Sequence, residues 1–519
     1  MRIGMALLVV VAGSLGWFGP ALARQAPSPP GFASRPASAI QYLKASNPGE
    51  DDRLGIGDPL VGVTLALSAD GNTLAVSAPH EDSGATGING NQRDESAWDS
   101  GAVYVFTRSA NRWTQQAYLK ASNTQVSDKF GFSVALSGDG NTLAVGATLE
   151  DSSSRAINGN QADNSAESSG AVYVFARSGG AWSQQAYLKA SNADPGDQFG
   201  WSVAISGDGN TLAVGAQTEA GVGLGVNADQ ADNSAADAGA VYVFARAGAA
   251  WAQRAYVKAS NTQAGDRFGF SVTLSADGNT LAAGSYDEDG GGKDVNPASD
   301  EAAPNSGAAY LFVRRDAAWM QEAYLKASNT VRNMAFGSSI ALSPDGGTLA
   351  VGAVDESNLT RGIDGDQAST PDNAVSAGAV FVFARTGGWR HQAYIKSSNI
   401  GPTDLFGIRL AFSRDGNILA AGAPGQSGGG RGFDARPEDS SAPESGAVYV
   451  FVRKGDRWTQ QTYVKAPNSG EFDQFGSGVA LSADGATLAA ATNSEDGGGG
   501  INGNQADDSV RDSGAVFVF

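Results

Sequence analysis

The sequence predicts an all-β fold, a seven-bladed β-propeller in which each blade contains four antiparallel strands. The first observation is a sequence motif, Tyr-Leu-Lys-Ala-Ser-Asn or a close variant, that recurs at steps of 68 to 76 residues. Self-similarity at a nearly fixed period marks an array of one supersecondary unit. The second observation is that the two ends of the chain carry complementary parts of one unit. The seven copies of the Tyr-Leu-Lys-Ala-Ser-Asn motif begin at Tyr42, Tyr118, Tyr187, Tyr256, Tyr324, Tyr394 and Tyr463.

The second copy of the unit reads as four strands. Residues 130–137 alternate large apolar with small or polar side chains, which is the period of a half-buried strand. A turn containing Asp139-Gly140 leads to a second strand at 142–147, because Asp-Gly tolerates the backbone angles of a tight hairpin. A long polar segment precedes a third strand at 170–175, and the fourth follows at 182–189. No segment has the apolar period of a helix.

The chain ends predict a closed ring. A single copy of the fourth-strand motif lies at residues 39–44, before the first complete unit. After the last copy of this motif only three predicted strands follow, at 476–482, 487–491 and 514–519. The N-terminal strand would complete the last blade and remove the exposed edge of an open array. An open solenoid is the alternative, and it would have no use for this complementarity.

The N-terminus has the features of a secretory signal at residues 1–23. Arg2 supplies a positive charge, residues 5–12 an apolar core, and Ala21-Leu22-Ala23 a small-x-small cleavage site. An uncleaved anchor is the alternative. Residues 24–36 are rich in Pro and Ser and predict a lead-in to a propeller at 37–519. We therefore expect a protein of the bacterial periplasm, exterior or cell surface, with no membrane span after signal cleavage.

Composition narrows the function classes. The chain has no Cys, so a disulfide framework or a thiolate metal site is not possible. A formal net charge of −19 disfavours binding to nucleic acid or anionic lipid.

Phe-Gly opens six of the units, at Phe130, Phe199, Phe268, Phe336, Phe406 and Phe475. In the sixth unit the second strand closes with Gly422-Ala423-Pro424. These residues resemble the FG-GAP repeat of the integrin α-subunit N-terminal propeller and its bacterial relatives, over residues 37–519. The resemblance implies the propeller fold, but the family spans adhesion receptors, accessory domains of enzymes and other exported proteins. In the first unit Val61-Gly62 is expected to replace Phe-Gly, after an insertion of about seven residues from Gly55.

The calcium site of integrin-like repeats is not expected here. It needs Asp-x-Asp-x-Asp-Gly in the turn between the first two strands, whereas each turn of this chain has one Asp. One carboxylate cannot supply the six to eight oxygen ligands of Ca²⁺. We expect these residues to bond to the backbone of their own turns: Asp70, Asp139, Asp208, Asp277, Asp345, Asp415 and Asp484.

The seven loops after the second strands run to about 20–25 residues, a length typical of functional or disordered loops. They contain 33 Asp and Glu residues against seven Arg or Lys, a surplus of 26 negative charges. Since loops after strands two and four emerge on one face of the ring, the sequence predicts an acidic face.

A recurring loop motif, Ile-Asn-Gly-Asn-Gln-Ala-Asp, makes calcium a possible cofactor. Its oxygen donors and a Glu upstream could chelate Ca²⁺. The alternatives are a loop held by Asn and Asp side chains that bond to their own backbone, and direct contact of these side chains with a ligand. The candidate ligands are Glu150, Asn158, Asn160 and Asp163 in the second unit and Glu495, Asn502, Asn504 and Asp507 in the seventh.

The remaining repeated residues are expected to be structural. A Trp begins six of the fourth strands and should cover the outer rim of the sheet or fill the gap between blades, with a sugar-stacking platform as the alternative. The Lys that ends each fourth strand should act as a local counter-charge. His80 and His391 lie in different units, so no histidine-based triad or zinc site is expected.

These observations favour an exported, non-enzymatic, monomeric propeller that binds a protein or glycan partner through its acidic long-loop face, in adhesion or envelope assembly. The alternative is a glycosidase-like hydrolase of an exported polymer, with carboxylates in the central depression.

Overall fold

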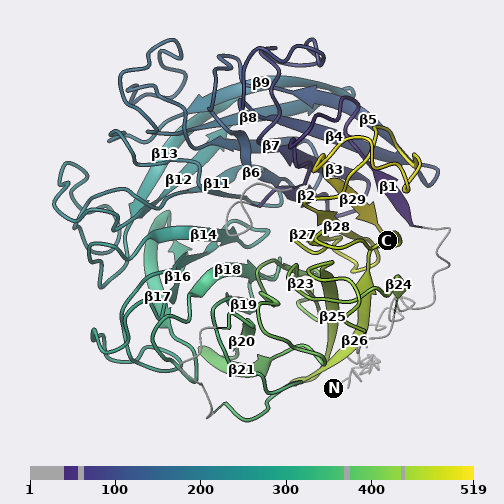
Figure 1. The fold of residues 1–519 in the computed structure, drawn as a ribbon. Coiled ribbons are helices and arrows are strands. Elements are labelled where there is room, and N and C mark those ends of the chain that lie inside the picture. Colours follow the sequence, from purple (N-terminus) through teal and green to yellow (C-terminus); the bar gives the residue numbers. More distant parts are fainter. Residues whose placement is uncertain (1–39, 56–62, 368–374, 434–438) are drawn as a thin grey trace, which may run out of the picture.

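The structure is a computed structural model that describes residues 40–55, 63–367, 375–433 and 439–519. Seven antiparallel sheets stand around a common axis like the blades of a propeller (Figure 1). Strands are the only regular elements in the described ranges, and no helix there could span a membrane. The expected signal at 1–23 and lead-in at 24–36 lie outside the described residues.

In blades one to five the strands run in chain order from the innermost to the outermost (Figure 1). Blade one contains β2 (Leu65–Leu67), β3 (Thr73–Ala78), β4 (Ala102–Ser109) and β5 (Arg112–Leu119). Blade two contains β6 (Phe130–Leu136), β7 (Thr142–Ala147), β8 (Ala171–Ser178) and β9 (Ala181–Leu188). Blade three contains β10 (Ser202–Ile205), β11 (Thr211–Ala216), β12 (Ala240–Ala247) and β13 (Ala250–Val257). Blade four contains β14 (Phe268–Leu274), β15 (Thr280–Ser285), β16 (Ala308–Arg315) and β17 (Ala318–Leu325).

Blade five contains β18 (Phe336–Leu342), β19 (Thr348–Ala353), β20 (Ala379–Arg385) and β21 (Trp389–Ile395). Blade six contains β22 (Leu410–Phe412), β23 (Ile418–Ala423), β25 (Ala447–Lys454) and β26 (Arg457–Lys465), and the short β24 (Gly432–Phe433) pairs with β26. Blade seven contains β27 (Gly478–Leu481), β28 (Leu488–Thr492), β29 (Ala515–Val518) and the N-terminal β1 (Gln41–Leu43). The four-strand unit predicted from the second copy is thus confirmed.

The hydrophobic core lies between neighbouring blades. One buried cluster joins residues of β3, β4 and β5 to residues of β6, β7 and β8. Phe130, the aromatic residue of the Phe-Gly pair, is fully buried and makes edge contacts with Tyr173 and Phe175, at centroid distances of 5.4 and 6.0 Å. Such T-shaped pairs stabilise the packing beyond the area that they bury. Each blade therefore depends on its neighbour for its core.

The two ends of the chain close the ring, as the sequence predicts. Strand β1 pairs antiparallel with β29, with Tyr42 opposite Phe517 (Figure 1). A buried cluster then joins Leu43 and Val516 of blade seven to Leu65 and Leu74 of blade one. Closure gives blade seven four antiparallel strands, as in blades one to five.

The expected replacement of Phe-Gly in the first unit is wrong, because Leu54-Gly55 takes that place. The Leu54 amide donates to the Ser513 carbonyl at 3.0 Å, as the Phe130 amide donates to Ser100 at 2.9 Å. Gly55 has φ +91°, close to the +94° of Gly131, and a Cβ there would lie 2.7 Å from the Cβ of Ala491 in the preceding blade. Only glycine adopts this backbone without strain. The insertion therefore follows this pair; residues 56–62 are outside the described ranges.

The hairpin aspartates hold their own turns, as predicted. In blade two the Asp139 carboxylate accepts hydrogen bonds from the Ser137 hydroxyl at 2.6 Å and the Asn141 amide at 2.9 Å. The same pattern recurs around Asp70 and Asp208.

The tryptophans fill the gap between blades, which is one of the two structural places predicted for them. The Trp182 indole N–H donates to Gln116 of the preceding blade at 2.9 Å, and the Arg177 guanidinium lies 5.3 Å from the Trp182 ring centroid. The hydrogen bond joins the outer edge of blade two to blade one, while the cation–π contact holds the indole in place within blade two.

Candidate functional site

The loops that follow the second and fourth strands are joined to one another on one face of the ring, here called the long-loop face. The Asn123 side chain, which follows β5 of blade one, donates to the Gln161 carbonyl in the long loop of blade two at 3.0 Å. The Ser122 hydroxyl donates to the Gln161 side chain. The repeated loop motif therefore fastens the long loop of one blade to the residues that follow the fourth strand of the preceding blade.

A buried glutamate lies at the centre of this junction. Glu150 is 1% exposed, and its carboxylate accepts from the Tyr187 hydroxyl at 2.7 Å and the Lys189 ammonium at 2.9 Å. Both partners belong to the repeated Tyr-Leu-Lys-Ala-Ser-Asn motif of the same blade. The carboxylate also accepts from the Asn123 amide of the preceding blade at 3.2 Å. We call this arrangement the latch.

The latch repeats around the ring. Five blades carry the Glu–Lys ion pair, with N–O distances of 2.5 to 2.9 Å and side chains at most 2% exposed. Burial lowers the pKa of these lysines, and the glutamate charge opposes that shift. The pairs are Glu81–Lys120, Glu150–Lys189, Glu219–Lys258, Glu288–Lys326 and Glu356–Lys396. The predicted role of the lysines as counter-charges is confirmed, but in the interior and not on the surface.

Blades six and seven depart from the pattern. In blade seven the Lys44 ammonium donates to the Glu495 backbone carbonyl at 3.0 Å and to Ser513 at 2.6 Å. In blade six Gln426 replaces the glutamate, and its side-chain oxygen accepts from Lys465 at 3.2 Å and from Tyr463 at 2.8 Å. Burial lowers the pKa of Lys465 to about 7.

The latch changes the charge expected on the long loops. The six glutamates are at most 4% exposed, so they contribute no surface charge. Setting these six aside leaves 27 acidic against seven basic loop residues, a surplus of 20 in place of the predicted 26.

The structure brings the four predicted calcium ligands of the second unit into two separate sets of hydrogen bonds. Glu150 belongs to the latch, and the Asn158 side chain accepts from the Tyr187 amide at 2.9 Å. Asp163 lies at the loop surface, where it accepts from the Ser153 amide at 3.0 Å. Hydrogen bonds from Ser153 lower the pKa of the Asp163 carboxyl. The Asn160 side chain accepts from the Ala162 amide of its own turn at 3.1 Å.

The seventh unit repeats this division. Glu495 accepts from the Tyr42 hydroxyl at 3.2 Å, and the Asn502 side chain accepts from the Tyr42 amide at 3.0 Å. Asp507 accepts from Gly498 and Asn504 from Ala506, each at 3.1 Å. Among the described residues, no three His, Asp or Glu side chains form a group that could hold a metal ion. Calcium binding stays an untested alternative to the self-bonded loop.

A second set of buried carboxyls precedes the Phe-Gly pairs, and sequence reasoning missed it. Asp128 is 3% exposed and accepts from the Gln125 amide at 2.9 Å. Burial raises the pKa of its carboxyl to about 8. Burial likewise raises the pKa of the equivalent carboxyls to between about 6 and about 8: Asp52, Asp197, Asp266, Asp404 and Asp473.

One titratable cluster breaks the repeat. The His80 Nδ1 and the Lys129 ammonium each lie 2.8 Å from the same carboxylate oxygen of Asp99. Burial and the Lys129 charge lower the pKa of His80. His391 is in a different blade, on β21. This separation of the two histidines agrees with the sequence.

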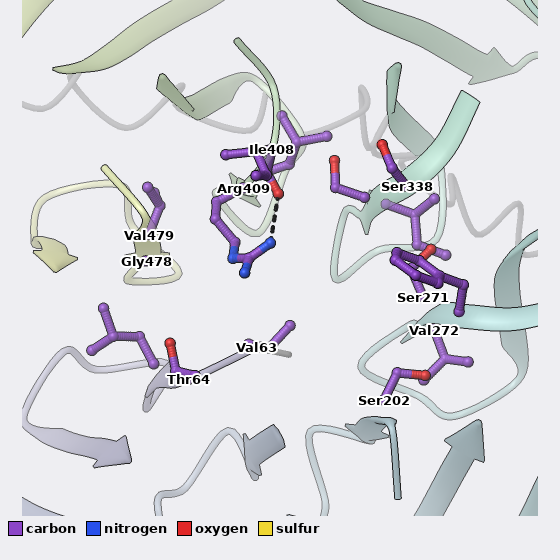
Figure 2. A pocket seen from close by; sticks show the side chains of 15 residues that line it. Val63, Thr64, Ser202, Ser271, Val272, Ser338, Ile408, Arg409, Gly478 and Val479 are labelled. Atoms are coloured by element: carbon purple, nitrogen blue, oxygen red, sulfur yellow. Dashed lines mark hydrogen bonds between the residues drawn. The ribbon is translucent and has the colours of Figure 1, made fainter. Parts of the chain in front are cut away.

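A cavity of about 70 Å³ lies on the ring axis (Figure 2). Its lining comes from the innermost strands of several blades, and Arg409 is the one charged side chain among the described lining residues. The Arg409 guanidinium points into the cavity and donates to the Ile408 carbonyl at 3.0 Å (Figure 2). The hydrolase alternative placed carboxylates in this depression, and the described part of the lining contains none.

Four aromatic side chains, here called the aromatic arc, gather where the inner strands meet the long-loop face. The centroid distance from Phe132 to Trp201 is 4.8 Å, and from Trp201 to Phe270 it is 5.8 Å. Tyr286 stacks on Phe270 at 4.7 Å with an interplanar angle of 22°. Phe270 also lines the axial cavity. The signal available in the sequence was the aromatic residue after Phe-Gly in three consecutive units only.

Comparison with known proteins supports the repeat. A model of the FG-GAP repeat matches residues 113–175, 182–244, 251–312 and 319–383. A comparison with curated proteins finds no match. Among solved structures, similar chains occur in a crystal structure of the mitotic checkpoint complex (12% identity, TM-score 0.45, 94% of this chain and 96% of that one) and in Kuenenia stuttgartiensis hydrazine synthase (13% identity, TM-score 0.44, 86% and 94%).

Proposed function

Because the chain belongs to the FG-GAP repeat family of β-propellers, we propose that it is a non-enzymatic binding or scaffold protein. Its partner is a protein or glycan at the cell envelope or outside the cell, and the binding surface is the long-loop face. The observation that carries this proposal is the fastening of long loops to the neighbouring blades by the latch. Long loops that a rigid scaffold positions are the usual place for binding residues.

Charge supports the choice of face. The long loops keep a surplus of 20 negative charges after the buried glutamates are set aside, although the whole chain carries −19. The hairpin loops on the opposite face are short and their repeated aspartates bond to their own turns. An acidic surface favours association with a complementary partner and speeds encounter at low salt.

The test compares matched charge-neutralising variants on the two faces. Glu95→Gln with Asp508→Asn changes two exposed long-loop residues outside the latch, and Asp316→Asn with Asp456→Asn changes two exposed residues on the hairpin face. Partners are captured from an envelope extract and from a glycan array by the unmodified protein, and their affinities are measured at 50 and 300 mM salt. We expect the long-loop variant alone to weaken binding and reduce its salt dependence. Equal effects from both variants would remove the reason for preferring this face.

A further inference from the structure

A ring of backbone hydrogen bonds joins neighbouring blades on the hairpin face, opposite the long-loop face. The residue before the repeated Asp of each hairpin turn donates its amide hydrogen to the carbonyl of the equivalent residue in the next blade. The described residues form six such bonds, at 2.8 to 2.9 Å. They run from Ala69 to Gly138, Gly138 to Gly207, Gly207 to Ala276, Ala276 to Pro344, Arg414 to Ala483 and Ala483 to Ala69.

This ring is interrupted once, at the contact between blades five and six; the contact between two neighbouring blades is here called a seam. Pro344 occupies the repeated position in blade five, and proline has no amide hydrogen to donate to the Arg414 carbonyl of blade six. Residues 343–346 read Ser-Pro-Asp-Gly where residues 68–71 read Ser-Ala-Asp-Gly. The same side-chain hydrogen bonds hold both turns. The proline therefore removes the bond to the next blade and leaves its own turn intact.

The same seam lacks a carboxylate in its latch on the long-loop face. At the other six seams an Asn of one blade donates to the latch glutamate of the next, at 2.5 to 3.3 Å. Blade five contributes Asn399, but blade six has Gln426 in place of the glutamate. The Gln426 amide donates to the Ser427 carbonyl, and its oxygen accepts from Tyr463 and Lys465 of its own blade. A neutral side chain supplies no charge-assisted bond across the seam.

The middle of this seam stays packed. The Trp458 indole N–H donates to Gln392 of blade five at 3.0 Å, and the Ser339 hydroxyl donates to the Gly407 carbonyl of blade six at 2.5 Å. One buried cluster contains residues of β20 and β21 together with residues of β23 and β25. Blades five and six therefore keep their central contacts, while a link that the other seams have is missing at each face.

We propose that the seam between blades five and six is a hinge at which the ring flexes and opens. Two packed elements that lack links at both ends move about the contacts that remain between them. The long loops of blades five and six lie on either side of this hinge, so its motion changes the spacing between two parts of the long-loop face. The hinge does not depend on the proposed function, because it requires no partner.

Hydrogen exchange of the chain that begins at residue 24 measures opening at each seam separately. The Phe406 amide donates to the Ala377 carbonyl across the hinge at 3.0 Å, and the Phe130 amide donates to the Ser100 carbonyl across the seam between blades one and two at 2.9 Å. Since two links are missing at the hinge, we expect the protection factor of the Phe406 amide to be about tenfold lower than that of Phe130. Equal protection of the two amides would overturn the inference.

Two variants move the missing links. Pro344→Ala with Gln426→Glu gives blades five and six the residues that other blades carry, and it should raise the protection of Phe406 to that of Phe130. Ala69→Pro is the matched control, because it removes the ring bond to Gly138 from a turn that otherwise has the same sequence. It should lower the protection of Phe130 and leave Phe406 unchanged.

Unchanged protection of Phe406 in the double variant would contradict the hinge, since both links would then be irrelevant to opening. A uniform loss of protection at all seams after Ala69→Pro would show that the ring opens as a whole, and it would also overturn the inference.

Discussion

The Asn47 side-chain nitrogen lies 3.1 Å from a carboxylate oxygen of Glu81, and this hydrogen bond joins the N-terminal strand's end to blade one. The same Asn–Glu contact joins Asn123 to Glu150 and Asn192 to Glu219. The latch therefore closes the ring with the same bond that joins successive blades. This explains why the Tyr-Leu-Lys-Ala-Ser-Asn motif is the most regular part of the sequence. Its Tyr and Lys bind the glutamate of their own blade, and its Asn binds the glutamate of the next blade.

Removing one latch carboxylate should destabilise the protein. Glu150→Gln leaves the Lys189 ammonium buried without its counter-ion, which costs about 3–5 kcal/mol of unfolding free energy when the pair is fully buried. Thermal and denaturant unfolding measure the loss. The control is Glu150→Gln with Lys189→Met, which removes both charges and should recover most of the stability. A single variant as stable as the unmodified protein would show that the ion pair contributes nothing.

Blade six offers the reverse experiment. Gln426→Glu gives Lys465 the carboxylate that five other blades have, and we expect a gain of about 1–3 kcal/mol at pH 7 from a charge-assisted hydrogen bond. Burial holds the pKa of Lys465 at about 7, so in the unmodified protein its charged form is disfavoured on folding. Stability from this group should therefore rise with pH from about 7 towards 10.5, and Gln426→Glu should flatten that rise. A variant of lower stability across this range would contradict the account.

The buried aspartates predict the opposite dependence at lower pH. Burial raises the pKa of Asp128 to about 8, whereas an exposed Asp titrates near 3.9. The folded state then holds a proton that the unfolded state releases, so this contribution to stability falls as pH rises from about 4 to 8. Each such group contributes a slope of at most about 1.4 kcal/mol per pH unit.

Asp128→Asn is the variant that isolates this effect, because an amide oxygen can still accept from Gln125. We expect the variant to match the unmodified protein at pH 4 and to exceed its stability at pH 8. Blade five already has Met334 at the equivalent position, which shows that the fold does not require a carboxyl there. An identical pH profile for the two proteins would mean that Asp128 is ionised in the folded state.

Calcium can be tested directly at the long loops. The predicted ligand oxygens of both units already accept hydrogen bonds from the chain, so we expect EDTA or several millimolar Ca²⁺ to leave the melting temperature unchanged. Asp163→Asn with Asp507→Asn is the control. A reversible shift with calcium that this double variant reduces would establish the loop site that the sequence allowed.

The repeat made the fold predictable, since period-2 apolar patterns, Asp-Gly turns and the unpaired strand at residues 39–44 all agree on a closed ring. The burial of the latch was not predictable in the same way. Glu150 and Lys189 are 39 residues apart, and each reads as a solvated charge until pairing of the strands places both beside Tyr187. Counting Glu150 among the surface charges of the loop was the resulting error.

The prediction of the pair that replaces Phe-Gly in the first unit was wrong for a related reason. Val61-Gly62 and Leu54-Gly55 each share only the Gly with Phe-Gly, so the letters do not decide between them. The Gly at this site is selected by its approach to the preceding blade, which only three-dimensional placement reveals. Gly55 makes that approach, to Ala491. The aromatic arc was likewise invisible, because Phe132, Trp201 and Phe270 lie 69 residues apart and become neighbours only through the curvature of the ring.

The most direct test of the account is ring closure by the two chain ends. Deleting residues 24–47 removes β1 and the Asn47 contact, which leaves the edge of β29 unpaired and blade one without its latch to blade seven. Light scattering coupled to size exclusion, together with thermal unfolding, would compare this variant with a chain that begins at residue 24. We predict aggregation or a large fall in melting temperature. A truncated protein that remains monomeric with an unchanged melting temperature would contradict closure of the ring by the N-terminal strand.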